Sequence, residues 1–328
     1  MKTVSFDRYG GIEVLHLSEV DKPRSKKNEV LVKIYASSLN DWDTGMSLGL
    51  PLFMRLFTGW FKPKVEYQYP GCDVAGVVES IGEDVTQLKI GDRVYGDQCI
   101  SGFSTFAEYV CVPEDTLTPI PKDMTYEQAA CLPQAGQLAV QGLIDTGHLQ
   151  PGQKLLINGA GGGAGTVGVQ IAKDIGCEIT VVDKASKLDM LLALGAHHAI
   201  DYEERDFCKL DEQYDLIFDT RTTRSPFSHN KALKKGGQYV TVGGSMIRYL
   251  QALLLNPVVS RISGRNHRLV TQKPNKDLPM LSEMFESGKL IPVIDSVHDL
   301  DDFKTAYEIF YSAKQKGNVV ICMNQNTN

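Results

Sequence analysis

Short apolar or alternating runs dominate the first third of the chain. Runs at 29–39, 73–82 and 106–113 are bounded by Gly, Pro and Asp, the residues that commonly end strands and form turns. A further short run at 90–96 carries glycines near both of its ends. The pattern predicts a small barrel or sandwich of antiparallel strands in this part of the chain.

Apolar positions take helical spacing over 124–144, and strands then alternate with helices. The expected strands are 154–158, 178–183, 197–202, 214–220, 237–244 and 267–272, and the expected helices are 164–176, 187–195 and 225–236. Strands rich in β-branched residues that alternate with helices indicate a parallel, doubly wound sheet. The fold class is therefore α/β, with a β-rich part before the parallel sheet.

The end of the chain loses this alternation. Amphipathic helices are expected at 278–288 and 301–313, and strands at 291–300 and 317–323. We therefore expect three segments, in which the last returns to pack on the first. They are a β-rich domain at 1–122, a doubly wound domain at 123–288, and the returning segment at 289–328.

Composition places the chain among globular proteins, with 42% hydrophobic and 23% charged residues. A net charge of −6 gives no reason to expect nucleic acid as a partner. The first residues lack the apolar stretch of a secretory signal, and no apolar run reaches the ~20 residues of a membrane span. The seven cysteines include no C-x-x-C pair, which favours a reducing compartment. We expect a cytoplasmic protein without an integral membrane segment.

A glycine-rich loop follows the strand at 154–158 and opens the next helix. Bare backbone at a helix N-terminus lets a pyrophosphate reach N–H groups, and the helix dipole favours the anion. Two registers fit. Gly163, Gly165 and Gly168 match G-x-G-x-x-G literally, whereas a register of Ala160, Gly162 and Gly165 starts closer to the strand and is preferred.

Several motifs in fixed order resemble the medium-chain dehydrogenase/reductase superfamily, and most closely its zinc-independent quinone oxidoreductase and enone reductase branch. They lie at 70–96, 150–173, 194–202 and 214–220. The resemblance implies a GroES-like catalytic domain and a Rossmann domain that binds NADP. The expected cofactor-binding residues are Ala160, Gly161, Gly162, Gly163, Ala164, Gly165, Thr166, Val167, Asp183, Lys184, Ser186, Lys187, Tyr202, Thr220, Val242 and Gly243.

By the same resemblance, Asn40 and Asp43 match an N-x-x-D pair near the nicotinamide and are the candidate catalytic residues. The alternative is that both stabilise a turn through side-chain-to-backbone bonds. Zinc-dependent members of the superfamily carry Cys, His and Cys where this chain has Asn40, Cys72 and Gln134. One thiolate is not a zinc site, because three protein ligands are normal, so we expect no metal.

Without a Lewis acid, an alcohol or simple carbonyl is poorly polarised. A quinone or an α,β-unsaturated carbonyl compound delocalises the charge that hydride transfer creates, so hydrogen bonds suffice. The sequence therefore favours a zinc-independent NAD(P)H-dependent reductase of such compounds. The alternatives are a reductase or dehydrogenase of another carbonyl class, or a non-catalytic NADP(H)-binding sensor. The sensor gains support from Asp41 and from Leu138, where many relatives have Thr facing the carboxamide.

The choice between NADPH and NADH rests on 183–187 and Tyr202. Asp183 ends a strand, where an acid accepts hydrogen bonds from a ribose 2′-OH, which favours NADH. Lys184, Ser186, Lys187 and Tyr202 fall where the family binds a 2′-phosphate, which favours NADPH. We expect NADPH, with NADH as the alternative.

Two apolar segments, 48–61 and 249–260, remain to be explained. One interpretation is a lipophilic substrate pocket with a mobile cover. The alternatives are core and dimer packing, or, for 48–61, adsorption to a membrane surface through Arg55, Lys62 and Lys64. We also expect a homodimer, because 267–272 should be an edge strand, and in the family two such edges pair about a two-fold axis.

Overall fold

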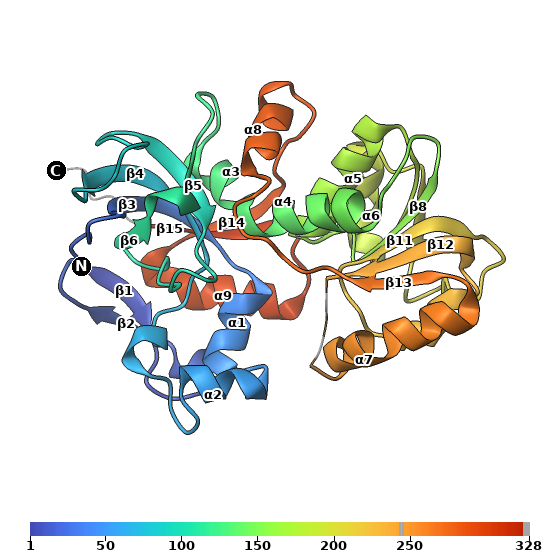
Figure 1. The fold of residues 1–328 in the computed structure, drawn as a ribbon, viewed down its shortest axis with the longest axis horizontal. Coiled ribbons are helices and arrows are strands. Elements are labelled where there is room, and N and C mark those ends of the chain that lie inside the picture. Colours follow the sequence, from blue (N-terminus) through green and yellow to red (C-terminus); the bar gives the residue numbers. More distant parts are fainter. Residues whose placement is uncertain (243, 245, 324–328) are drawn as a thin grey trace. The chain divides into compact units, whose positions relative to one another are not determined.

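The computed structural model describes residues 1–242, 244 and 246–323 of the chain (Figure 1). The chain forms two compact units. The first comprises Met1–Gln134, Pro274–Glu286 and the residues from Pro292 onward, and the second comprises Ala135–Lys273 and Ser287–Ile291. Helices α3 (Tyr126–Ala130) and α8 (Leu278–Glu286) thus belong to the first unit, whereas the sequence-based division had placed both in the second domain.

A seven-stranded sheet forms the first unit, in the order β14-β15-β3-β4-β5-β7, with β6 paired to β3. Its strands are β3 (Glu29–Ser38), β4 (Asp73–Ile81), β5 (Arg93–Asp97), β6 (Tyr109–Pro113), β7 (Thr118–Pro119), β14 (Ile294–Asp299) and β15 (Asn318–Cys322). All pairs are antiparallel except β14 with β15. The late strand β15 pairs directly with β3, so the end of the chain completes this sheet.

The core of the first unit is built from the apolar residues that the sequence pattern marks. Val30, Val32 and Ile34 of β3 are fully buried. Phe106 packs edge-on against Tyr307 of helix α9 (Phe303–Ser312), with ring centroids 6.0 Å apart. A two-stranded sheet of β1 (Lys2–Ser5) and β2 (His16–Glu19) completes the strands of this unit, and helices α1 (Asp41–Leu48) and α2 (Arg55–Thr58) follow β3.

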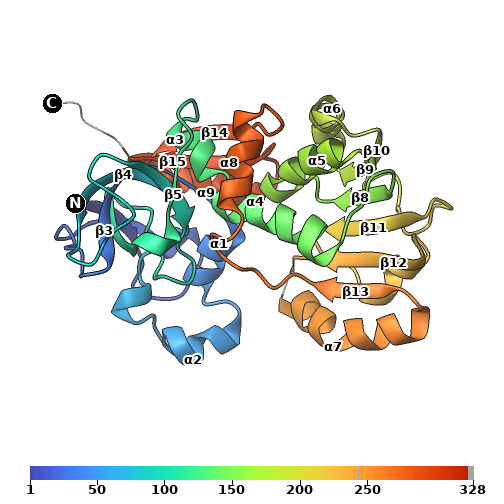
Figure 2. The same ribbon diagram turned by 45° about the horizontal axis from the view of Figure 1, so that its top comes forward.

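The second unit is a six-stranded parallel sheet in the order β10-β9-β8-β11-β12-β13 (Figure 2). Its strands are β8 (Lys154–Asn158), β9 (Glu178–Asp183), β10 (His198–Asp201), β11 (Tyr214–Asp219), β12 (Leu233–Thr241) and β13 (Asn266–Leu269). The strand order reverses between β8 and β11, which is the switch point where ligands bind in such sheets. The doubly wound parallel sheet expected from the sequence is confirmed, and β13 is an edge strand as expected.

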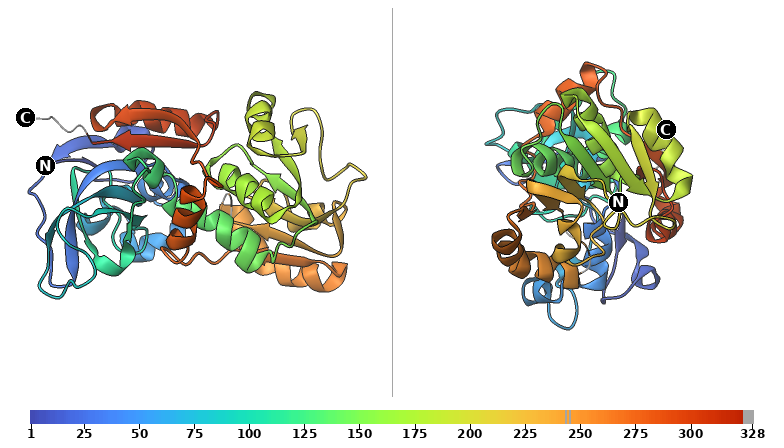
Figure 3. Two further views of the ribbon diagram at one scale, coloured as in Figure 1. Left: turned by 90° about the horizontal axis from the view of Figure 1, so that it is seen from above. Right: turned by 90° about the vertical axis from the view of Figure 1, so that its right-hand side faces the viewer.

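Helices flank this sheet (Figure 3). Helices α5 (Gly163–Ile175) and α6 (Ala185–Leu194) pack against each other, whereas α7 (Met246–Ser263) packs against the 3-10 helix at Pro226–Asn230. From the switch point, successive strands are added toward one edge of the sheet (β8, β9, β10) and then toward the other (β11, β12, β13). Because each crossover is right-handed, the two groups of helices lie on opposite faces of the sheet. Within the described residues, no helix combines the length and the apolar character that crossing a bilayer requires.

Two sequence-based elements are corrected. The helix expected over 225–236 is the short 3-10 helix Pro226–Asn230, and β12 already begins at Leu233 because this buried residue pairs with Tyr214 of β11. The helix expected over 124–144 is divided into α3, α4 (Pro133–Val140) and a π-helix at Gln141–Thr146. Pro133 lacks an N–H group, so it starts a new helix instead of continuing the previous one.

Candidate functional site

The glycine-rich loop connects the carboxyl end of β8 to the N-terminus of α5. Helix α5 begins at Gly163 after the N-cap Gly162, and no side chain of the loop caps it. A Cβ atom on Gly165 would lie 2.5 Å from the Cα atom of Ala160, so the helix packs directly on the loop there. A Cβ atom on Gly162 would meet nothing closer than 3.8 Å, which leaves room for a ligand to approach the backbone. This geometry favours the register of Ala160, Gly162 and Gly165, and the loop fits a pyrophosphate.

The carboxylate of Asp183, at the end of β9, is bound into this loop. Asp183 Oδ2 accepts a 2.7 Å hydrogen bond from the backbone N–H of Gly161, and Oδ1 accepts a 2.8 Å bond from that of Lys184. The ammonium group of Lys187 lies 3.7 Å from Oδ1, and both side chains are buried. A Cβ atom on Gly161 would lie 2.4 Å from Lys187 Cδ, so glycine is needed where the pair packs on the loop.

Three further residues expected at the 2′-phosphate lie around Asp183. Lys184 Nζ lies 3.8 Å from Glu203 Oε1, and both side chains reach solvent. The backbone N–H of Tyr202 donates to the carbonyl of Asp183, and the Tyr202 side chain is 44% exposed. Ser186 is exposed in the first turn of α6. The structure thus brings these residues to one end of β9, with Lys187 turned inward to the aspartate.

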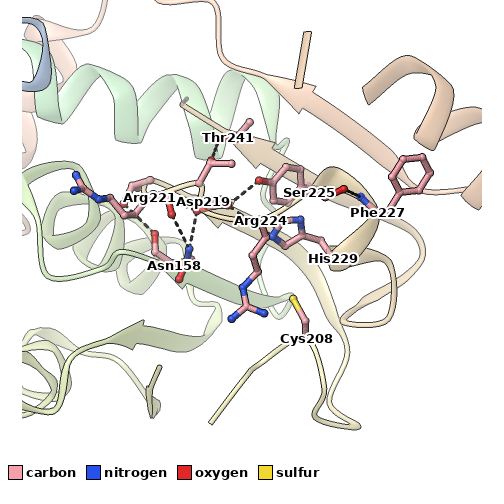
Figure 4. A network of polar contacts seen from close by, with 12 residues as sticks. Asn158, Cys208, Asp219, Arg221, Arg224, Ser225, Phe227, His229 and Thr241 are labelled. Carbon is pink, nitrogen blue, oxygen red and sulfur yellow. Dashed lines mark hydrogen bonds and ion pairs between the residues drawn. The ribbon is translucent and has the colours of Figure 1, made fainter. Parts of the chain in front are cut away.

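A buried polar network holds the first residues of the loop (Figure 4). Asp219, at the end of β11, is fully buried and accepts hydrogen bonds from Asn158 Nδ2 at 2.7 Å, Arg221 N at 3.1 Å and Tyr239 Oη at 2.7 Å. Burial raises the pKa of Asp219. The Asn158 side chain is therefore fixed by a charge-assisted bond immediately before Gly159, where the loop begins.

The hydroxyl of Thr220 binds the backbone at the start of the glycine-rich loop. It donates to the carbonyl oxygens of Asn158 and Gly159, both at 2.9 Å. The sequence places Thr220 among the cofactor residues but misses Asp219 and Tyr239. For Asp219, the available signal was a polar residue at the end of the otherwise largely apolar strand β11. Val242 follows the end of β12 and donates its backbone N–H to Asp219 O, whereas the expected Gly243 lies outside the described residues.

Two histidines complete this network as uncharged rings. His229 is fully buried and stacks on Tyr239 with ring centroids 4.1 Å apart. Its Nε2 atom lies only 3.7 Å from Asp219 Oδ2, but burial lowers the pKa of His229 to about 3, so the ring stays neutral near pH 7. His267 packs on the other side of Tyr239, and burial lowers its pKa to about 4. Both rings are therefore uncharged at neutral pH.

In the first unit, Asn40 and Asp43 lie at the start of α1. The backbone N–H of Asn40 donates to Asp43 Oδ2 at 2.7 Å, and that of Gly71 donates to Oδ1 at 3.1 Å. Asp43 is fully buried, and this burial raises its pKa to about 7. The carboxylate thus joins α1 to the turn before β4, which agrees with the alternative in which the pair stabilises a turn.

The side chain of Asn40 is directed at a second buried carboxylate. Its Nδ2 atom donates to Asp73 Oδ2 at 2.9 Å, and Ser38 Oγ donates to the same oxygen at 2.8 Å. The backbone N–H of Gln134 donates to Asp73 Oδ1 at 3.1 Å. Burial raises the pKa of Asp73 well above its ordinary value. Asn40 therefore orders this carboxylate and is itself only 7% exposed.

Comparisons with known proteins identify the family to which the chain belongs. Residues 26–122 match the alcohol dehydrogenase GroES-like domain, and residues 194–321 match the zinc-binding dehydrogenase domain. A 2-methylene-furan-3-one reductase from Solanum lycopersicum is 32% identical over 332 residues, which cover 98% of this chain and 79% of the relative. The chain belongs to the medium-chain dehydrogenase/reductase superfamily. Within it, the chain is quinone oxidoreductase-like.

Two further relatives support the branch. An NADPH-dependent alkenal/one oxidoreductase from Arabidopsis thaliana is 32% identical over 310 residues, which cover 90% of this chain and 72% of the relative. The structure of the quinone oxidoreductase from Coxiella burnetii superposes with a TM-score of 0.89 at 28% identity and covers 99% of both chains. The expected resemblance and the GroES-like and Rossmann fold are thereby confirmed.

The superfamily includes zinc enzymes, but the residues of this chain do not fit a zinc site. Asn40 directs its amide to Asp73, and Gln134 offers no anionic or imidazole ligand. Cys72 is fully buried, and as the one possible zinc ligand among these three residues it cannot supply the three protein ligands that are normal for zinc. Across 1–242, 244 and 246–323, no group of three His, Cys, Asp or Glu side chains is placed to hold a metal.

Proposed function

We propose that this protein is a zinc-independent, NADPH-dependent oxidoreductase that transfers hydride to a quinone or an α,β-unsaturated carbonyl compound. The observation that carries the proposal is the uncapped, glycine-lined N-terminus of α5 at the switch point of the parallel sheet. Support comes from relatives named as a 2-methylene-furan-3-one reductase and as an NADPH-dependent alkenal/one oxidoreductase. We also propose a cytoplasmic homodimer that accepts lipophilic substrates.

The second unit binds the cofactor, which supplies the hydride when bound. The N–H groups at the start of α5 hold the pyrophosphate, and Ala160, Gly162 and Gly165 keep the approach open. Lys184 and Tyr202 lie on the exposed side of the β9 end and bind the 2′-phosphate. Lys187 offsets the charge of Asp183, which would otherwise repel that phosphate.

The first unit carries Asn40 and Asp43, which fix the start of α1 and contribute to substrate binding in this proposal. Quinones and enones delocalise the charge that they receive, so hydrogen-bond donors stabilise it without a metal and solvent supplies the proton. Elemental analysis after dialysis tests the metal-free assignment. One zinc per chain would contradict it.

A turnover panel tests the reaction itself. We expect NADPH oxidation with quinones or enones and little with saturated aldehydes, and we expect NADH to be the poorer donor. Preferred turnover of aldehydes would assign the enzyme to another carbonyl class. Tight binding of NADPH without turnover of any acceptor would support the sensor alternative, for which Leu138 is the sequence feature.

A further inference from the structure

Residues 50–65 of the first unit, called the apolar segment below, expose an unusual number of large apolar side chains. These are Leu50, Leu52, Phe53, Leu56, Phe57, Trp60, Phe61 and Val65, with exposed fractions between 41% and 90%. The structure therefore contradicts core packing as the role of these side chains. Within its unit, α2 lies at the rim, away from the seven-stranded sheet (Figures 1 and 2). Exposed apolar clusters of this kind mark interaction surfaces.

The segment has a fixed shape. A 3-10 helix at Leu52–Met54 runs into α2, so side chains four residues apart share one face, and apolar pairs recur at 52–53 and 56–57. The hydroxyl of Tyr9 donates to Gly59 O at 2.7 Å. Arg55 donates to the carbonyls of Leu48 and Gly49 and stacks on the Tyr9 ring at 4.1 Å. Arg55 thus braces the segment, so the sequence-based expectation that this residue contacts a membrane surface is wrong for Arg55, and only Lys62 and Lys64 remain of the three cations named for that role.

Charge distinguishes the possible occupants of this surface. No Asp or Glu occurs between Asp43 and Glu66, whereas the chain as a whole carries −6. Lys62 and Lys64 are exposed beside Trp60 and Phe61, and neither forms an ion pair within the part of the chain that the structure describes. A second copy of the segment would bring like charges together, whereas anionic headgroups are complementary to them. Segments that lie in a membrane interface typically combine Leu, Phe and Trp with neighbouring Lys residues, as this segment does.

We propose that the apolar segment docks this protein on the surface of an anionic lipid bilayer. Leu56, Phe57, Trp60 and Phe61 enter the headgroup region, and Lys62 and Lys64 contact lipid phosphates. In this arrangement the protein lies on the bilayer surface and does not span it. Because two lysines alone would bind anionic lipid only weakly, membrane binding requires both the apolar side chains and the lysines. This inference goes beyond the proposed function and requires neither cofactor nor turnover.

Vesicle co-sedimentation of the full chain tests the proposal, with phosphatidylcholine vesicles compared to vesicles that also contain phosphatidylglycerol. We expect binding to the anionic vesicles only. Leu56→Ser/Phe57→Ser/Trp60→Ser/Phe61→Ser and Lys62→Glu/Lys64→Glu should each weaken it at least ~10-fold, about 1.4 kcal/mol. The matched controls are Leu253→Ser/Leu254→Ser/Val258→Ser/Ile262→Ser on α7, whose side chains are 48–74% exposed, and Lys314→Glu/Lys316→Glu, two exposed lysines at the same spacing. Both should bind as the parent does.

A second measurement does not depend on the multiple variants. Trp42→Phe leaves Trp60 as the sole tryptophan, and its emission should shift to shorter wavelength on addition of anionic vesicles. Absence of parent binding, equal losses in the controls, or an unshifted Trp60 emission would overturn the proposal. So would light scattering in which the fourfold serine variant converts a dimer to a monomer, because the surface would then pair two copies of the chain.

Discussion

The carboxylate of Asp183 accepts its shortest hydrogen bond, 2.7 Å, from the backbone N–H of Gly161. An acid at this strand end is expected to face a ribose, but here one oxygen is bound to the loop and the other lies near Lys187. Asp183, whose position in the sequence favoured NADH, thus stabilises the glycine-rich loop through its own hydrogen bond to Gly161. Asp183→Ser should therefore lower kcat/KM for both cofactors, and an improved kcat/KM for NADPH would contradict this role.

The buried pair of Asp183 and Lys187 should matter to stability in a way that Lys184 does not. Lys187→Ala leaves the Asp183 carboxylate buried without its cation, which costs about 3 kcal/mol of unfolding free energy. Among the described residues, the ion pair of Lys184 is a solvent-accessible contact with Glu203, so Lys184→Ala should change stability by less than ~1 kcal/mol. Urea unfolding measures both values. Equal effects of the two variants would show that the buried pair has no special role.

Cofactor preference should depend on Lys184. If it binds the 2′-phosphate, Lys184→Ala removes a charge-assisted contact of roughly 1.5–3 kcal/mol and raises KM for NADPH by ~10-fold or more. KM for NADH should stay unchanged, because NADH lacks that phosphate. Lys235→Ala, at another exposed lysine of the second unit, is the matched control. A parallel rise of both Michaelis constants would exclude phosphate recognition by Lys184.

The network around Asp219 should couple loop position to cofactor affinity. Asp219→Asn replaces an acceptor of three hydrogen bonds by an amide whose N–H group faces donors, which destabilises the protein by about 2 kcal/mol. Tyr239→Phe removes one of these bonds and should cost about 1 kcal/mol. Because Asn158 precedes the loop directly, we expect KM for NADPH to rise ~10-fold in Asp219→Asn at unchanged quinone KM. Loss of stability with an unchanged NADPH KM would limit the network to a structural role.

Acid should destabilise the second unit through His229. Its pKa is about 3 in the folded state, against 6.5 ordinarily, so below pH 6.5 the unfolded chain binds a proton that the folded chain does not. Stability is lost as pH falls from 6.5 toward 3, by about 2 kcal/mol at pH 5 for this group. His229→Phe keeps the ring stack but cannot titrate, and its unfolding free energy should fall less between pH 7 and 5. Asp43 and Asp219 have raised pKa values, so their protonation stabilises the folded state as pH falls. Because both residues are present in the parent and in His229→Phe, the difference between the two pH profiles reports on His229. Identical pH profiles would disprove the assignment.

The sequence predicts the loop well because its signals are local. Strand, glycines and helix follow one another within 154–176, and the residue type alone indicates that a side chain is excluded at Gly165, where the helix packs on the loop. The orientation of Asp183 is not readable, since strand-end position does not say whether a carboxylate faces a ligand or the N–H of Gly161. The network of Asn158, Asp219 and Tyr239 escapes notice because its members come from three strands that only the folded sheet brings together.

The same distinction between local and non-local signals explains why the helix expected over 225–236 is largely replaced by strand β12. Residues 225–236 have helical composition and a Lys-Gly ending, but Leu233 gains more by pairing with β11 in a buried sheet than by continuing a short helix. In the first unit, the partnership of Asn40 with Asp73 spans 33 residues of sequence and depends on how β3 and β4 align. Non-local register of this kind carries no signal in a window of neighbouring residues.

The pairing of β15 with β3 determines the order in which the two units can finish folding during synthesis on the ribosome. The second unit is nearly continuous in sequence and can close once residue 291 has emerged, whereas β3 waits for a partner almost 300 residues downstream. Until then, one side of β3 near Ala36–Ser38 presents unpaired backbone groups to neighbouring chains. The nascent protein is thus open to mispairing at this edge of β3, and a chaperone that shields the edge would protect the first unit until β15 has been synthesised.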